Sequence, residues 1–88
     1  MEETITIQLP NGWKPPESTL EPLLKMDDPQ WFTILRYVCG ELREAGNDDS
    51  VLHDYCEQAM ADDFRHLVRC SMVFMGEMEL EHDSPKFV

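Results

Sequence analysis

The sequence predicts a mostly α-helical domain with a small α+β character, built on two main helices. Apolar residues recur every three or four positions over about residues 29–45 and again over about residues 50–75, which is the spacing of one helix face. In residues 4–9, apolar and polar side chains alternate, which is typical of a short strand. A chain of 88 residues corresponds to one domain, so we expect residues 1–88 to form a single small acidic domain with residues 83–88 as a flexible tail.

The N-terminal third begins with the predicted strand and continues into a short helix. The sequence Pro-Asn-Gly from Pro10 ends the strand, because these residues favour turns. Ser18 and Glu21 stand at the positions of a capping box, in which each side chain satisfies a free backbone N–H at a helix start. Pro22 then falls in the first turn, where its missing N–H costs little. We therefore expect a short helix over residues 19–26.

The first main helix has a start signal, an apolar stripe and a stop signal. Asp28 can cap a helix, and Pro29 suits the first helical position. Gly46 is expected to end the helix near residue 45 in the left-handed conformation. The stripe between these signals consists of Trp31, Leu35, Val38 and Leu42.

The second main helix is expected to start at Asp49 or Ser50 and to reach about residue 75. Its apolar pattern is interrupted by Asp62 and Asp63, because Asp63 falls near the apolar side. A kink or a new helix start at residues 61–63 is therefore the alternative to one continuous helix.

After Gly76 the spacing of apolar residues changes from helical to alternating. Residues 77–82 fit a strand, with Gly76 as the cap of the preceding helix. They also fit a helix that simply continues, because Glu, Met and Leu are good helix formers. As a strand, residues 77–82 would pair with residues 4–9 in a two-stranded ribbon. Both interpretations remain open from the sequence.

The charge of the chain excludes several classes of ligand. Eighteen acidic residues stand against seven Lys and Arg, for a net charge of −11. Proteins that bind nucleic acid need Lys and Arg to neutralise phosphates, so we expect no direct binding to nucleic acid or to an anionic membrane. No apolar run is long enough to span a bilayer, and the acidic N-terminus does not resemble a secretory signal. We therefore expect a cytoplasmic protein.

Cysteines and histidines raise the question of a metal site. The three cysteines lie among apolar neighbours, so we expect them to be buried and reduced. Two His-Cys pairs have the spacing of zinc ligands, but on one continuous helix they would lie about 20 Å apart. We therefore expect no metal, no cofactor and no enzymatic activity. The three cysteines are Cys39, Cys56 and Cys70, and the two pairs are His53 with Cys56 and His66 with Cys70.

Two stretches of the chain, residues 40–64 and 70–85, are rich in acids and poor in bases. If residues 77–82 form a strand, their carboxylates share one face at intervals of about 6.7 Å. This interval resembles the charge spacing along a nucleic-acid backbone. We expect the acidic contacts with a partner to come from Asp48, Asp49, Asp54, Glu57, Glu77, Glu79 and Glu81.

In its short length, its acidity and its lack of an enzyme motif, the chain is similar to phage-encoded inhibitors that mimic nucleic acid, including several anti-CRISPR and anti-restriction proteins. This resemblance implies a small inhibitor that occupies the basic, nucleic-acid-binding surface of a partner protein. If the chain is virus-encoded, it would act in the host cytoplasm.

The alternative hypothesis is an assembly or adaptor protein that binds a partner or itself through residues 70–78. This segment is apolar almost all round, which is typical of helices that are buried or meet another chain. A homodimer formed through this segment is compatible with both hypotheses. Its contact residues would be Met72, Phe74, Met75 and Met78.

Overall fold

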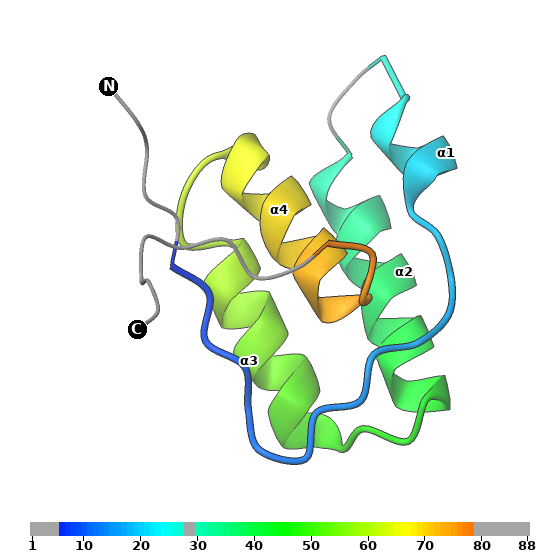
Figure 1. The fold of residues 1–88 in the computed structure, drawn as a ribbon. Helices are drawn as coiled ribbons and strands as arrows, with labels where there is room; N and C mark the ends of the chain where they lie inside the picture. The colour runs from blue at the N-terminus through cyan, green and yellow to red at the C-terminus, as the bar shows by residue number, and fades with distance from the viewer. Residues whose placement is uncertain (1–5, 28–29, 79–88) are drawn as a thin grey trace, which may run out of the picture.

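A computed structural model of the protein describes residues 6–27 and 30–78 (Figure 1). Within these ranges the chain is mostly helical, as predicted, and each of the three longer helices contacts the other two. The first of these runs in one direction, the second returns and the third reverses again (Figure 1). The helices are α1 (Glu21–Leu24), α2 (Trp31–Glu44), α3 (Asp49–Ala59) and α4 (Phe64–Phe74).

Residues 6–20, which we call the strap, contain neither helix nor strand and run along the outside of the bundle (Figure 1). The strap follows α3, passes the α2–α3 turn and rises beside α2 to reach α1 (Figure 1). Ile7 and Leu20, near its two ends, are buried in the common core. The strap therefore completes the core on the side that the three long helices leave open.

The predicted ribbon of residues 4–9 and 77–82 is wrong for the part that the structure describes, where no strand occurs. The backbone N–H of Gln8 donates to Gln58 Oε1 at 2.7 Å, and Gln58 Nε2 donates to the Gln8 carbonyl at 2.6 Å. A side-chain amide on α3 thus replaces the partner strand. Of the second predicted strand, only residues 77 and 78 are described, and they form a bend after α4.

The predicted continuous helix over residues 50–75 is also wrong, because the chain ends α3 at Ala59 and starts α4 at Phe64. The alternative of a new helix start at residues 61–63 is confirmed. Asp63 caps α4, since its carboxylate accepts a hydrogen bond from the backbone N–H of His66 at 3.0 Å. Neither glycine nor proline is needed for this chain reversal.

The signals at the other helix ends are confirmed in part. Gly46 and Gly76 have φ angles of 99° and 78° after α2 and α4, as their predicted roles as left-handed caps require. The predicted capping box is wrong, because the Ser18 hydroxyl donates instead to the Glu41 carboxylate on α2. Leu20 occupies the N-cap position of α1 and provides no side-chain cap. The predicted signals Asp28 and Pro29 lie outside the described residues.

The core is centred on two aromatic rings, Tyr55 of α3 and Phe74 of α4, whose centroids lie 5.3 Å apart. Trp13 of the strap packs edge-on against Phe74 with centroids 6.1 Å apart, and its indole Nε1 donates to the Phe74 carbonyl at 3.2 Å. The Tyr55 hydroxyl lies 2.5 Å from the buried Ser71 hydroxyl. Burial raises the pKa of Tyr55 well above its ordinary value.

Asn47, in the α2–α3 turn, attaches the middle of the strap to the bundle. Its Oδ1 accepts from the Lys14 backbone N–H at 2.8 Å, and its Nδ2 donates to the Lys14 carbonyl at 2.6 Å and to the Leu42 carbonyl at 3.0 Å. Pro15 follows, and a Cβ atom on Gly76 would lie only 2.7 Å from the Pro15 Cβ. Both the backbone angle and this close approach therefore favour glycine at position 76.

None of the helices among residues 6–27 and 30–78 is both long enough and apolar enough to cross a membrane.

Candidate functional site

The acidic residues of α3 and its two flanking turns form the largest base-free stretch of the described chain. No Lys or Arg occurs between Arg43 and Arg65. Every acid in this interval is exposed or half-exposed. We call the six acids that belong to α3 and its flanking turns the α3 acidic face, and they are Asp48, Asp49, Asp54, Glu57, Asp62 and Asp63.

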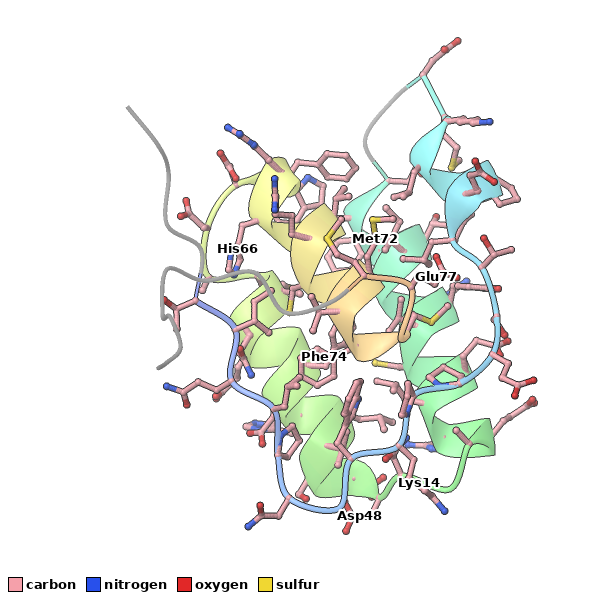
Figure 2. All side chains as sticks on the ribbon, in the orientation of Figure 1. Lys14, Asp48, His66, Met72, Phe74 and Glu77 are labelled. Atoms are coloured by element: carbon pink, nitrogen blue, oxygen red, sulfur yellow. The ribbon has the colours of Figure 1, made fainter. Side chains whose placement is uncertain are left out.

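Two residues of the α3 acidic face also cap helices. Asp48 caps α3 by accepting from the Val51 backbone N–H at 3.3 Å, and it accepts from the Ser50 hydroxyl at 2.8 Å. The hydrogen bond from Ser50 has the largest effect on the pKa of Asp48, and the one from Val51 adds to it. Both lower this pKa below its ordinary value, because they stabilise the charged carboxylate. Asp63 caps α4 in the same way. Both carboxylates therefore combine a structural role with an exposed charge (Asp48 is labelled in Figure 2).

Two other acids of this face have a basic neighbour. Asp49 pairs with Arg43 of α2 at 3.1 Å, and Glu57 lies 3.6 Å from His53 one turn earlier on α3. All four side chains are mostly exposed, so water and salt screen both contacts. The Arg43–Asp49 pair contributes about 0–1 kcal/mol, and the His53–Glu57 contact is an ion pair only when the imidazole is protonated. A strongly basic partner could therefore displace them at little cost.

The side chains of His53, Asp54 and Glu57 offer ligand atoms that all lie within 4.8 Å of one another. The signal for this cluster in the sequence is its spacing on a helix, i, i+1 and i+4, which did not enter the predicted metal ligands. All three residues are exposed or half-exposed, and exposed acidic groups commonly gather without an ion. We therefore treat the cluster as part of the α3 acidic face.

The four residues considered as zinc ligands are not gathered in the described structure. The separation of about 20 Å assumed a continuous helix, and that assumption fails at residues 60–63. His66 Nε2 lies 2.7 Å from the Gln58 carbonyl, and because a carbonyl oxygen can only accept, this nitrogen donates the hydrogen bond and is not offered to a metal. Cys70 is fully buried, and Cys56 contacts Cys39 instead.

Glu77, predicted to be the first carboxylate of an exposed ladder, has an internal contact. Its Oε1 accepts from the Leu20 backbone N–H at 3.1 Å, which joins the bend after α4 to the end of the strap (Figure 2). Its Oε2 is buried and has no hydrogen-bond partner among the described residues. Glu79 and Glu81 lie outside the described residues.

The apolar segment predicted to contact a partner lies mainly inside the protein. Phe74 and Met75 are 0% and 1% exposed, so in this fold their side chains make contacts within the chain itself. Met72 and Met78 are half-buried and pack against the same core. The segment is apolar on several sides because α2 and α3 cover one side of α4 and the strap covers another.

Three large apolar side chains of the described residues are exposed, and none of them was predicted from the sequence to be a contact: Met26 just after α1, Phe32 and Met60. Phe32 of α2 is 76% exposed and Met60, just after α3, is 52% exposed. Together with Gln30 and Trp31 they line an open hollow. Trp31 in turn packs on Phe64 with ring centroids 5.8 Å apart. The available signal was that Phe32 falls off the apolar stripe of its helix.

Comparisons with protein-family models, with curated proteins and with solved structures find no match to this chain.

Proposed function

We propose that this protein is a small inhibitor that binds a basic, nucleic-acid-binding surface of a partner protein through its α3 acidic face. The observation that carries this proposal is the interval from Arg43 to Arg65, which holds exposed and half-exposed acids and no Lys or Arg. Ordinary exposed helices mix both signs of charge along their sequence. The Asp and Glu residues of α3 have no Lys or Arg on the same helix, so α3 is suited to a partner of the opposite sign, although Arg43 of α2 pairs with Asp49.

Electrostatic attraction would act in two steps. The net charge of −11 would draw the protein towards a cationic groove over distances comparable with the screening length, about 8 Å at physiological salt. At contact, the carboxylates would take the place of phosphate groups, because Arg side chains bind both through paired hydrogen bonds. The same charge would repel nucleic acid itself.

We assign the main contacts of the proposed interaction to three residues of the α3 acidic face. Asp54, Glu57 and Asp62 have exposed or half-exposed carboxylates and cap no helix. Asp48 and Asp49 belong to the same face and contribute charge. We do not include Glu77 among the residues proposed to contact the partner, because its carboxylate accepts a hydrogen bond from the Leu20 backbone N–H at the end of the strap.

The test is a matched pair of triple variants that each remove three negative charges. One carries Asp54→Asn, Glu57→Gln and Asp62→Asn. The control carries three substitutions away from α3, namely Glu17→Gln, Glu21→Gln and Asp27→Asn. The partner is first captured from a lysate of the native cells with wild-type protein and then purified. Its affinity for each variant is measured by calorimetry at 50 and 200 mM salt.

We expect the α3 variant to bind at least tenfold more weakly and the control to stay within about threefold of the wild type. We also expect duplex or single-stranded nucleic acid to compete with the wild-type protein for the partner. Equal affinities of the two variants, affinity independent of salt, or simultaneous binding of nucleic acid would each contradict the proposal. Circular dichroism of both variants checks that the fold is retained.

A second candidate function, assembly or adaptor binding through an apolar contact, is favoured by the exposure of Phe32 and Met60. Their exposure moves the candidate apolar contact from residues 70–78 to the hollow beside α2. Phe32→Ser should then abolish partner binding or self-association that persists at high salt. Multi-angle light scattering at several protein concentrations measures self-association, and a monomer at all of them would exclude self-assembly.

A further inference from the structure

Cys39 of α2 and Cys56 of α3 face each other across the contact between their helices. Their Sγ atoms lie 3.5 Å apart, within hydrogen-bond distance for sulfur. Both residues are half-exposed, whereas the third cysteine, Cys70, is fully buried. The two thiols are therefore preassembled, and both residues lie at the boundary between the core and the solvent.

We propose that Cys39 and Cys56 form a redox modification site, at which a small-molecule disulfide converts the two thiols into a disulfide that links α2 to α3. This proposal is independent of the proposed inhibitory function. The expectation that all three cysteines are buried is wrong for Cys39 and Cys56, which are half-exposed because they lie at the edge of the contact between α2 and α3. In this proposal the reduced pair is one of two states of the site.

The geometry requires only a small closing movement. A disulfide has an S–S distance of about 2.05 Å, so the two sulfur atoms must approach by about 1.5 Å. Rotation of the two side chains, with a shift of α3 against α2, would supply this movement. The new bond would close a loop that contains the α2–α3 turn with Gly46 and Asn47.

The reaction balances with the small-molecule disulfide as the only oxidant. One cysteine, as a thiolate, attacks this disulfide, forms a mixed disulfide and releases one small thiol. The second cysteine then attacks the protein sulfur of the mixed disulfide and releases the second small thiol. Two protein S–H bonds and one S–S bond of the oxidant become one protein S–S bond and two S–H bonds of the released thiols.

The surroundings of Cys39 indicate that this reaction is slow. Burial, with the hydrogen bond to Cys56, raises the pKa of the Cys39 thiol to about 12, although Arg43 on the same helix acts in the opposite direction. The pKa of Tyr55 is raised, so its nearby phenol stays neutral and supplies no charge. A thiol with so high a pKa is a poor nucleophile, which fits a slowly oxidised cross-link better than a catalytic cysteine.

The test uses the wild-type full chain, because trypsin places each cysteine on a different peptide. Cleavage after Arg36, Arg43, Arg65 and Arg69 puts Cys39 in residues 37–43, Cys56 in residues 44–65 and Cys70 after residue 69. Reduced protein is incubated with oxidised glutathione for increasing times, alkylated and digested without reduction. Mass spectrometry then identifies the linked peptides.

We expect residues 37–43 to become linked to residues 44–65, with the loss of two hydrogen atoms from the intact mass and one free thiol left. The melting temperature should rise on the order of 10 °C, because the cross-link restricts the unfolded chain. Cys39→Ser and Cys56→Ser should each abolish both changes, and Cys70→Ala should abolish neither. A link to Cys70, a link between two chains, or three free thiols after prolonged oxidation would overturn the proposal.

Discussion

Replacing Asn47 by alanine tests whether a single side chain attaches the strap to the helix bundle. Asn47 is only 7% exposed and makes three hydrogen bonds with backbone groups, two with Lys14 of the strap and one with the Leu42 carbonyl at the end of α2. Alanine removes all three bonds at once. It leaves the N–H and C=O of Lys14 without these partners in a partly buried position.

The expected loss of stability follows from the number of bonds. Each hydrogen bond contributes about 0.5–1.5 kcal/mol net, so we expect Asn47→Ala to lower the free energy of unfolding by about 2–4 kcal/mol. A domain of this size has a total of about 4–13 kcal/mol. The melting temperature should therefore fall by on the order of 10–20 °C. Asn47→Asp should destabilise at least as strongly, because its carboxylate would face two carbonyl oxygens in place of the amide donor.

Thermal and urea unfolding followed by far-UV circular dichroism measure these changes. Asn11→Ala is the matched control, since Asn11 is exposed in the same strap, and it should change stability by less than about 0.5 kcal/mol. Gln58→Ala removes an analogous pair of bonds at an exposed position and should have an intermediate effect. A melting temperature of Asn47→Ala within 3 °C of the wild type would refute the reasoning.

Three further predictions concern the helices and the core. Tyr55→Phe leaves the buried Ser71 hydroxyl without its 2.5 Å partner and should cost about 1–3 kcal/mol, whereas adding Ser71→Ala should recover part of this loss. Asp63→Ala removes the cap of α4 and should cost about 1 kcal/mol, while Asp63→Asn should retain most of the stability because its side-chain oxygen still accepts from His66. Burial raises the pKa of Cys70 to about 12, so the free energy of unfolding should be constant from pH 7 to about pH 9 and fall above it, as the unfolded state alone releases the proton.

Urea unfolding measures all three. A double variant that loses the sum of the two single losses would show that Tyr55 and Ser71 do not interact. Equal stabilities of the alanine and asparagine variants at position 63 would exclude the cap as the cause. An unfolding free energy that stays constant to pH 10.5 would contradict the burial of neutral Cys70 and Tyr55.

Much of the helical fold could be predicted because its signals are local. The stripe from Trp31 to Leu42 marks the buried side of α2 at the spacing that its own backbone imposes. The roles of Gly46 and Gly76 follow from the left-handed angle that a helix end requires. The break before α4 was visible as an alternative, because Asp63 offers a cap while it interrupts the apolar pattern.

The candidate site was harder to predict because exposure depends on what packs against each side chain. Counting charged residues could find the acids of α3, because the net charge of a stretch of sequence does not depend on how the chain folds. It could not show that the Glu77 carboxylate turns inward to bind the backbone of Leu20, the last residue of the strap. Leu20 lies 57 positions earlier in the chain. It also could not show that Phe74 and Met75 are covered while Phe32 is left exposed.

The amino-acid sequence alone determined the excess of negative charge, the apolar faces of the helices and the glycines that end two of them. The net charge is a sum over residues, and the other two features depend only on residues close together in the chain. Packing was needed to place the strap, to bring Cys39 next to Cys56 and to bury Phe74 and Met75. Those contacts join residues 17 to 61 positions apart. Their distance in space depends on how helices and loops of particular lengths meet around one core, and neither composition nor periodicity contains that information.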